Sequence, residues 1–91
     1  LAELDSTIAL EIRQRASEIA SNLAALEAAD AGIAAATEAR RVIGERYQAG
    51  VATNTDVVDA QVAVLQAQLD RTQAIASARL AEARLNRALG R

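Results

Sequence analysis

The sequence predicts an all-α fold, a long antiparallel α-helical coiled-coil hairpin. Three observations support this prediction. Proline is absent and alanine is the most frequent residue, so nothing interrupts long helices. Hydrophobic residues make up 52% of the 91 residues but only one residue is aromatic, so a compact core would bury little apolar area. The one credible break is the segment around Gly50, which has helical apolar spacing on both sides.

The first helix is expected over about residues 4–48. Apolar residues recur there with the heptad spacing of a coiled-coil seam. The expected seam consists of Ile12, Ala16, Ile19, Leu23, Leu26 and Ile33. Further along the helix, the seam positions are occupied by polar residues and a glycine, so the seam weakens there: Asp30, Thr37, Arg40 and Gly44. Gly32 and Gly44 each cost roughly 1 kcal/mol against alanine in a helix interior, a cost that local distortion or a close neighbour offsets.

The tip loop is expected at residues 49–55. Gly50 can adopt a positive φ without a Cβ clash, as the position just past a helix C-terminus requires. Thr53, Asn54 and Thr55 each carry a side-chain oxygen that can cap a new helix. Thr53 and Asp56 have the spacing of a capping box, with Asp in place of the usual Glu.

The second helix is expected over about residues 56–89, with Gly90 as its C-terminal stop. Its expected seam continues the alternation of three and four: Val58, Val62, Leu65, Leu69, Thr72 and Ala76. Other large apolar residues lie partly off this seam, namely Val57, Val64, Ile75, Leu80, Leu85 and Leu89. A helix that is apolar on more than one flank needs more than one neighbour, so we expect side-by-side association.

The two arms are unequal in length. A reversal near residue 52 pairs Leu26 with a position near Ala78, and leaves the first ten or so residues unpaired. Their apolar spacing, at Leu1, Leu4 and Ile8, implies a further partner. Because the chain also opens inside a helical pattern without Met, we expect residues 1–91 to be a single hairpin cut from a longer chain.

Composition excludes several functions. The net charge is −2 and the ten basic residues, all arginines, are scattered, so no nucleic-acid partner is expected. The absence of His and Cys argues against a zinc site, a disulfide framework and a catalytic constellation. The sequence contains no run of 18 apolar residues, so no membrane-spanning helix is expected. We therefore expect a protein that is not an enzyme and has no cofactor, metal or transmembrane helix.

Three polar features lie near the tip, and the first two have both a structural and a functional interpretation. Asp56 and Asp59 share a face in the first helical turn, where acidic residues stabilise the helix dipole. In an oligomer around an axis, the same carboxylates would form stacked rings that select cations. Tyr47 either packs at the helix end or bonds a carboxylate across a contact. A group of arginines late in the first helix complements its dipole: Arg40, Arg41 and Arg46.

These segments together resemble the TolC-like outer-membrane efflux proteins. The resemblance rests on Arg46-Tyr47-x-x-Gly50, on Asp56-Val57-Val58-Asp59-Ala60-Gln61 after five intervening residues, and on the closing Leu85-x-x-x-Leu89-Gly90. The upstream stretch from Glu11-Ile12-Arg13 to Glu38-Ala39 is similar to the helix that enters this motif. The chain is most similar to the second of the family's two internal repeats.

The resemblance implies a trimer in which each chain contributes a β-barrel part and two periplasmic α-hairpins to a twelve-helix tunnel. The hairpin is then part of a larger α-barrel, in the periplasm of a Gram-negative bacterium. Its tip would dock the periplasmic adaptor of a tripartite drug efflux or type I secretion system, through Arg46, Gly50, Val51, Ala52, Thr53 and Asn54. Asp56, Asp59 and Tyr47 would form the entrance gate. Some members have an arginine where this chain has Ala52, so the salt bridge of a TolC-type gate is in doubt.

Two other functions fit the helical pattern less well. A structural coiled-coil hairpin, such as that of a periplasmic adaptor, predicts an Arg-Leu-type tip, a two-stranded seam and a polar outside. An amphipathic helix on a lipid surface predicts Lys-rich faces and aromatic anchors. The sequence has none of these features.

Overall fold

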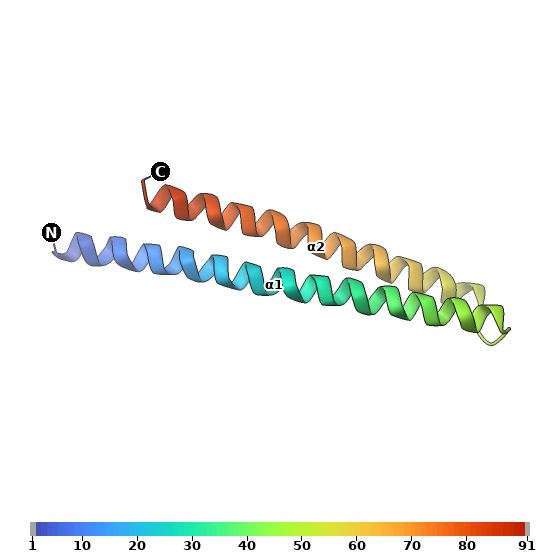
Figure 1. The fold of residues 1–91 in the computed structure, drawn as a ribbon. Helices are drawn as coiled ribbons and strands as arrows, with labels where there is room; N and C mark the ends of the chain where they lie inside the picture. Colours follow the sequence, from blue (N-terminus) through green and yellow to red (C-terminus); the bar gives the residue numbers. More distant parts are fainter. Residues whose placement is uncertain (1, 91) are drawn as a thin grey trace. The chain divides into compact units, whose positions relative to one another are not determined.

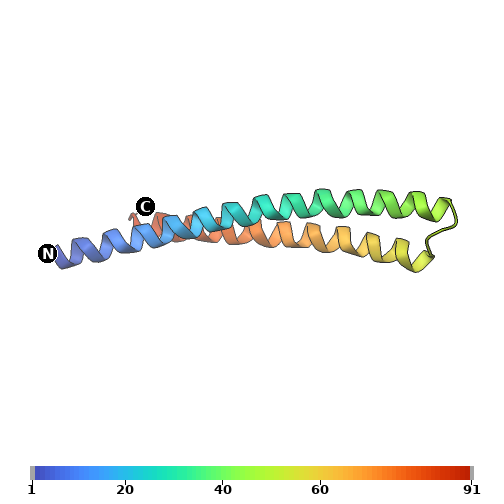
Figure 2. The ribbon, with the colours of Figure 1, turned by 90° about the horizontal axis from the view of Figure 1, so that it is seen from below.

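The computed structural model describes residues 2–90, which form two helices, α1 (Ala2–Gln48) and α2 (Asn54–Ala88). The fold is all-α, and α1 and α2 run antiparallel as a hairpin (Figure 1). The chain divides into two units, residues 27–72 and residues 1–26 with 73–91. In both Figure 1 and Figure 2 the two helical segments of each unit lie side by side.

The tip of the hairpin has well-defined helix caps on both sides. Gly50 has a φ of 78°, so the chain reverses where the sequence predicts. Val51 N donates to the carbonyl of Arg46 at 2.9 Å and Gly50 N donates to that of Tyr47 at 3.0 Å. These two bonds define a Schellman motif, which satisfies carbonyl groups that the end of α1 would otherwise leave free.

The predicted capping box at the start of α2 is confirmed. Asp56 N donates to Thr53 Oγ1 at 3.1 Å, and Thr53 N donates to Asp56 Oδ2 at 2.9 Å. Thr53 is therefore the N-cap, and α2 begins at Asn54, two residues before the expected start near Asp56. The loop between the helices is correspondingly short, residues 49–53.

In the unit of residues 27–72, the buried and half-buried positions of both helices follow a heptad pattern in which alanine alternates with larger residues. On α1 they include Ala29, Ile33, Ala36 and Ile43; on α2 they are Val57, Ala60, Val64, Ala67 and Arg71. Val64, 5% exposed, is the one buried residue among the described residues of this unit. Alanine contributes little apolar area, so most of the apolar area that the two helices of this unit bury comes from the Ile and Val side chains.

In the unit of residues 1–26 with 73–91, the same pattern recurs. The facing positions are Ile12, Arg15, Ile19, Asn22 and Leu26 on α1, and Ala74, Ala78, Ala81, Leu85 and Ala88 on α2. Ala81 is buried, at 2% exposure. Residues 3–11 are all exposed, Leu4 at 60% and Ile8 at 43%, so the predicted unpaired arm is confirmed for them. Leu1 lies outside the described residues.

The predicted seam of α1 is correct at every seventh position but wrong at the positions between. Ala16 and Leu23 are exposed, Leu23 at 54%, and the half-buried residues are Arg15 and Asn22. Both polar side chains reach Glu18: Arg15 Nη1 donates to Glu18 Oε1 at 2.9 Å, and Asn22 Nδ2 donates to the Glu18 carbonyl at 2.8 Å. A prediction from hydrophobicity alone does not find Arg15 and Asn22, because their aliphatic carbons pack against α2 while their polar ends form hydrogen bonds within α1.

The predicted seam of α2 is on the wrong face of the helix. All six of its residues are exposed: Val58, Val62, Leu65, Leu69, Thr72 and Ala76. The face that packs on α1 starts one residue earlier, at Val57, and is mostly alanine. Small side chains allow the two helix axes to come close, so the larger apolar residues are left on the outside.

This arrangement gives α2 a second apolar stripe, which we call the outer stripe: Val58, Val62, Leu65 and Leu69. Their exposed fractions are 47%, 57%, 59% and 58%. The prediction that the hairpin has more apolar surface than its two helices bury against each other is therefore confirmed, with the two faces of α2 exchanged.

Candidate functional site

The residues predicted to dock an adaptor form the exposed tip of the hairpin. Arg46, Gly50, Thr53 and Asn54 are exposed, and Ala52 is half-buried. Val51, at 74% exposure, is the most exposed of the large apolar side chains in the described part of the chain. The caps on both sides hold this loop in one conformation, so the tip presents an apolar side chain on a preformed turn.

The three predicted gate residues are all exposed and lie on either side of the tip. Tyr47 is 46% exposed in the last turn of α1, and Asp56 and Asp59 are in the first turns of α2. Asp56 has a structural role as well, because its carboxylate completes the capping box. Within residues 2–90, no hydrogen bond joins Tyr47 to either aspartate.

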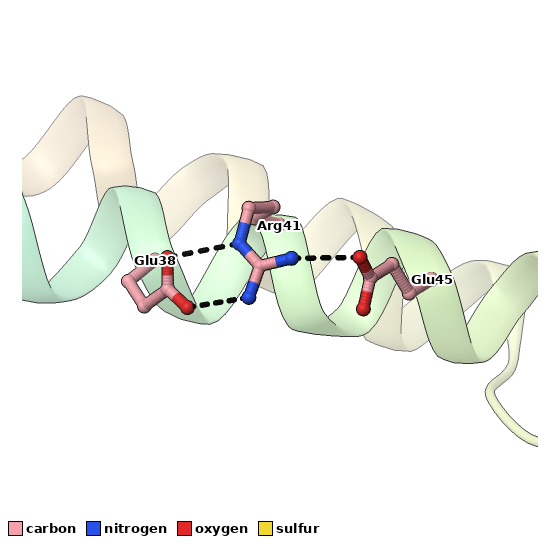
Figure 3. A network of polar contacts seen from close by, with 3 residues as sticks. All are labelled: Glu38, Arg41 and Glu45. Atoms are coloured by element: carbon pink, nitrogen blue, oxygen red, sulfur yellow. Dashed lines mark hydrogen bonds and ion pairs between the residues drawn. The ribbon is translucent and has the colours of Figure 1, made fainter.

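The predicted arginine group near the end of α1 contains one fully paired member. Arg41 donates from Nε and Nη2 to Glu38 at 2.9 and 2.6 Å, and from Nη1 to Glu45 Oε1 at 2.7 Å (Figure 3). The hydrogen bonds from Arg41 hold the pKa of Glu38 below its usual 4.5, and charge attraction acts in the same direction. The same contacts raise the pKa of Arg41, so it stays charged at any ordinary pH.

The lowered pKa of Glu38 predicts a pH dependence of stability. The pair stabilises the helix above pH 4.5, the carboxyl's ordinary pKa, and this contribution is lost as pH falls through the lower value in the folded chain. We expect Glu38→Gln to reduce the loss of thermal stability between pH 6 and 3, followed by circular dichroism, and 1 M salt to remove the difference. Glu27→Gln, which removes an exposed carboxylate of the same helix, is the control. An equal change in both variants would contradict the prediction.

Ion pairs that cross from α1 to α2 were not predicted from the sequence. Arg71 Nε contacts Asp30 Oδ1 at 2.5 Å in one unit, and Arg84 Nη1 lies 4.0 Å from Glu18 Oε2 in the other. The spacing contained a clue, since Arg71 comes seven residues after Val64 and so occupies a position on the packed face.

The described residues contain no group of acidic or histidine side chains that could hold a metal ion. No helix within them is long and apolar enough to cross a membrane. What they offer instead is a capped tip and an apolar outer stripe, which are features of an interaction element.

A family model described as outer membrane efflux protein matches residues 5–91. The chain therefore belongs to the outer membrane efflux protein family, as the tip motif predicted. It is a component of an efflux channel of the Gram-negative outer membrane, and the family is one of transport proteins, not of enzymes. No curated protein and no solved structure matches the chain.

Proposed function

We propose that the chain is the periplasmic hairpin at the entrance of a trimeric outer-membrane channel, and that its tip docks the periplasmic adaptor of an efflux or type I secretion system. The hairpin is one part of a larger α-barrel wall. The observation that carries this proposal is the arrangement of the two apolar faces of α2 in residues 54–72.

The angle between these faces is informative. With 3.6 residues per turn, the mean direction of the face packed on α1 and that of the outer stripe differ by about 150° around the helix axis. In a regular ring, neighbours about 150° apart correspond to about twelve helices, whereas a four-helix bundle needs about 90°. This angle supports a place in the wall of a wide helical tube, with α1 on one side of α2 and a helix from outside this chain on the other.

Gly32 supports the same arrangement. It lies inside α1 and is exposed, and a Cβ at this position would meet nothing within 4 Å. No contact among residues 2–90 therefore requires glycine at this position, although the residue costs roughly 1 kcal/mol in a helix interior. Close approach of a neighbouring helix outside the chain would account for it.

The tip residues follow from this placement. Arg46, Gly50, Val51, Ala52, Thr53 and Asn54 form the docking surface, with Val51 as its apolar contact. Tyr47, Asp56 and Asp59 surround the entrance, where copies of each carboxylate form acidic rings that select cations. Because the loop has Ala52, this entrance lacks the loop arginine of the salt bridge in a TolC-type gate.

Removal of the acidic charge in the parent channel tests the gate. Asn can replace Asp56 without loss of the cap, since its side-chain oxygen can still accept from Thr53 N. We expect the Asp56→Asn/Asp59→Asn channel to bind divalent cations at least about tenfold more weakly in single-channel block, because the rings have lost their charge. Asp70→Asn, further along the same helix, should leave block unchanged. Unaltered block in the double variant would remove the gate assignment.

A further inference from the structure

The ion pair between Asp30 and Arg71 lies at the edge of the face through which α1 and α2 pack in residues 27–72. Arg71 Nε contacts Asp30 Oδ1 at 2.5 Å, and the two side chains are 43% and 56% exposed. Arg71 follows Val57 and Val64 at intervals of seven, so its stem lies on the packed face while its charged end reaches α1. It is the direct hydrogen bond between side chains of α1 and α2 in the described part of this unit.

A second contact of the same kind occurs in the other unit. Glu18 Oε2 has no hydrogen-bond partner among the described residues and almost no solvent contact, and Arg84 Nη1 lies 4.0 Å away. The other oxygen of Glu18 is bound by Arg15 of its own helix. Glu18 is thus held in place by α1 while its free oxygen is directed towards the arginine of α2.

The sign of these contacts is the same in both units. The acid belongs to α1 and the arginine to α2 each time. We infer that Glu18, Asp30, Arg71 and Arg84 form a charge code that makes α1 pair with α2 and not with another copy of itself. This specificity concerns how the hairpin closes, and it does not depend on a role as a channel.

The code is needed because an alanine face discriminates poorly between partners. One alanine position resembles the next, so size and shape give little preference for α2 over other alanine-rich helices. An α1–α1 pair would contribute only the acids of the code, Glu18 and Asp30, and an α2–α2 pair only its arginines, Arg71 and Arg84. Like charges in these pairings repel, whereas the hairpin brings opposite charges together.

Cysteine cross-linking in the 91-residue chain tests the code, because the natural sequence has no cysteine. Cysteines at Ala36 and Val64, on the facing sides of α1 and α2, report closure of the hairpin as a cross-link within one chain. We expect Glu18→Arg/Asp30→Arg to lower the yield of this cross-link about fivefold in low salt, and to increase cross-linked dimers.

Exchange of both partners separates pairing from a general loss of structure. Adding Arg71→Glu and Arg84→Glu should restore the yield within one chain, with helicity by circular dichroism unchanged throughout. Glu11→Arg/Glu27→Arg makes the same charge change on exposed positions of α1 and should leave the yield unaltered. The inference is overturned if the first variant keeps the natural yield, if the exchanged variant fails to regain it, or if the control loses as much.

Discussion

Replacement of Gly50 by proline is expected to unfold the tip and to prevent assembly of the pump. Proline fixes φ near −65°, whereas Gly50 has a φ of 78°, and it removes the N–H that donates to the Tyr47 carbonyl at 3.0 Å. We expect the free energy of unfolding of the isolated chain to fall by about 3 kcal/mol or more. In the parent channel, the adaptor should no longer co-purify.

Two further variants distinguish docking from folding. Gly90 has nearly the same conformation, with a φ of 77°, so Gly90→Pro should damage a helix end without affecting the adaptor. Val51→Asp changes a side chain that is 74% exposed, so stability should change by about 0.5 kcal/mol or less while adaptor binding is lost. Normal co-purification of the adaptor with both Gly50→Pro and Val51→Asp channels would show that the tip is not the docking surface.

Introduction of charge on the outer stripe is expected to abolish lateral association while the hairpin itself stays folded. Val58 and Leu65 are 47% and 59% exposed, so Val58→Asp/Leu65→Asp removes few contacts within the chain. Against a neighbouring helix, each substitution replaces an apolar contact that contributes about 1.5–3 kcal/mol when fully buried. Association of the isolated chain in sedimentation should weaken at least about tenfold, and the parent channel should fail to form trimers.

The matched control lies on the same turns of α2. Gln61→Asp/Gln68→Asp adds the same two charges at the same spacing, to exposed positions that are already polar. This variant should associate as the natural chain does. A tight, concentration-independent monomer for the natural chain, or equal association of the two double variants, would contradict the proposal that the outer stripe is a contact surface.

Much of the fold follows from local sequence features. Gly50 and the Thr53–Asp56 capping box determine where the helices end, because positive φ and side-chain caps are properties of a few neighbouring residues. The exposed arm at Leu4 and Ile8 follows from the unequal lengths on either side of that break.

The candidate site was predictable only in part. The tip motif led to the family, which the match over residues 5–91 bears out. The double role of Asp56, and the pairing of Arg41 with two glutamates, required coordinates. The contact between Asp30 and Arg71 was missed because these residues are 41 positions apart and neither belongs to a known motif.

By itself, the sequence determined that this protein is a helical hairpin, that it reverses at Gly50, and that it carries more apolar surface than two helices can cover. Only the tertiary structure decided which face of α2 meets α1. Two heptad stripes run along that helix, beginning at Val57 and at Val58, and both satisfy the periodicity. Periodicity shows only that a helix face is apolar. Which of the two faces of α2 packs on α1 depends on the size of the side chains across the contact, because the face richer in alanine permits closer packing.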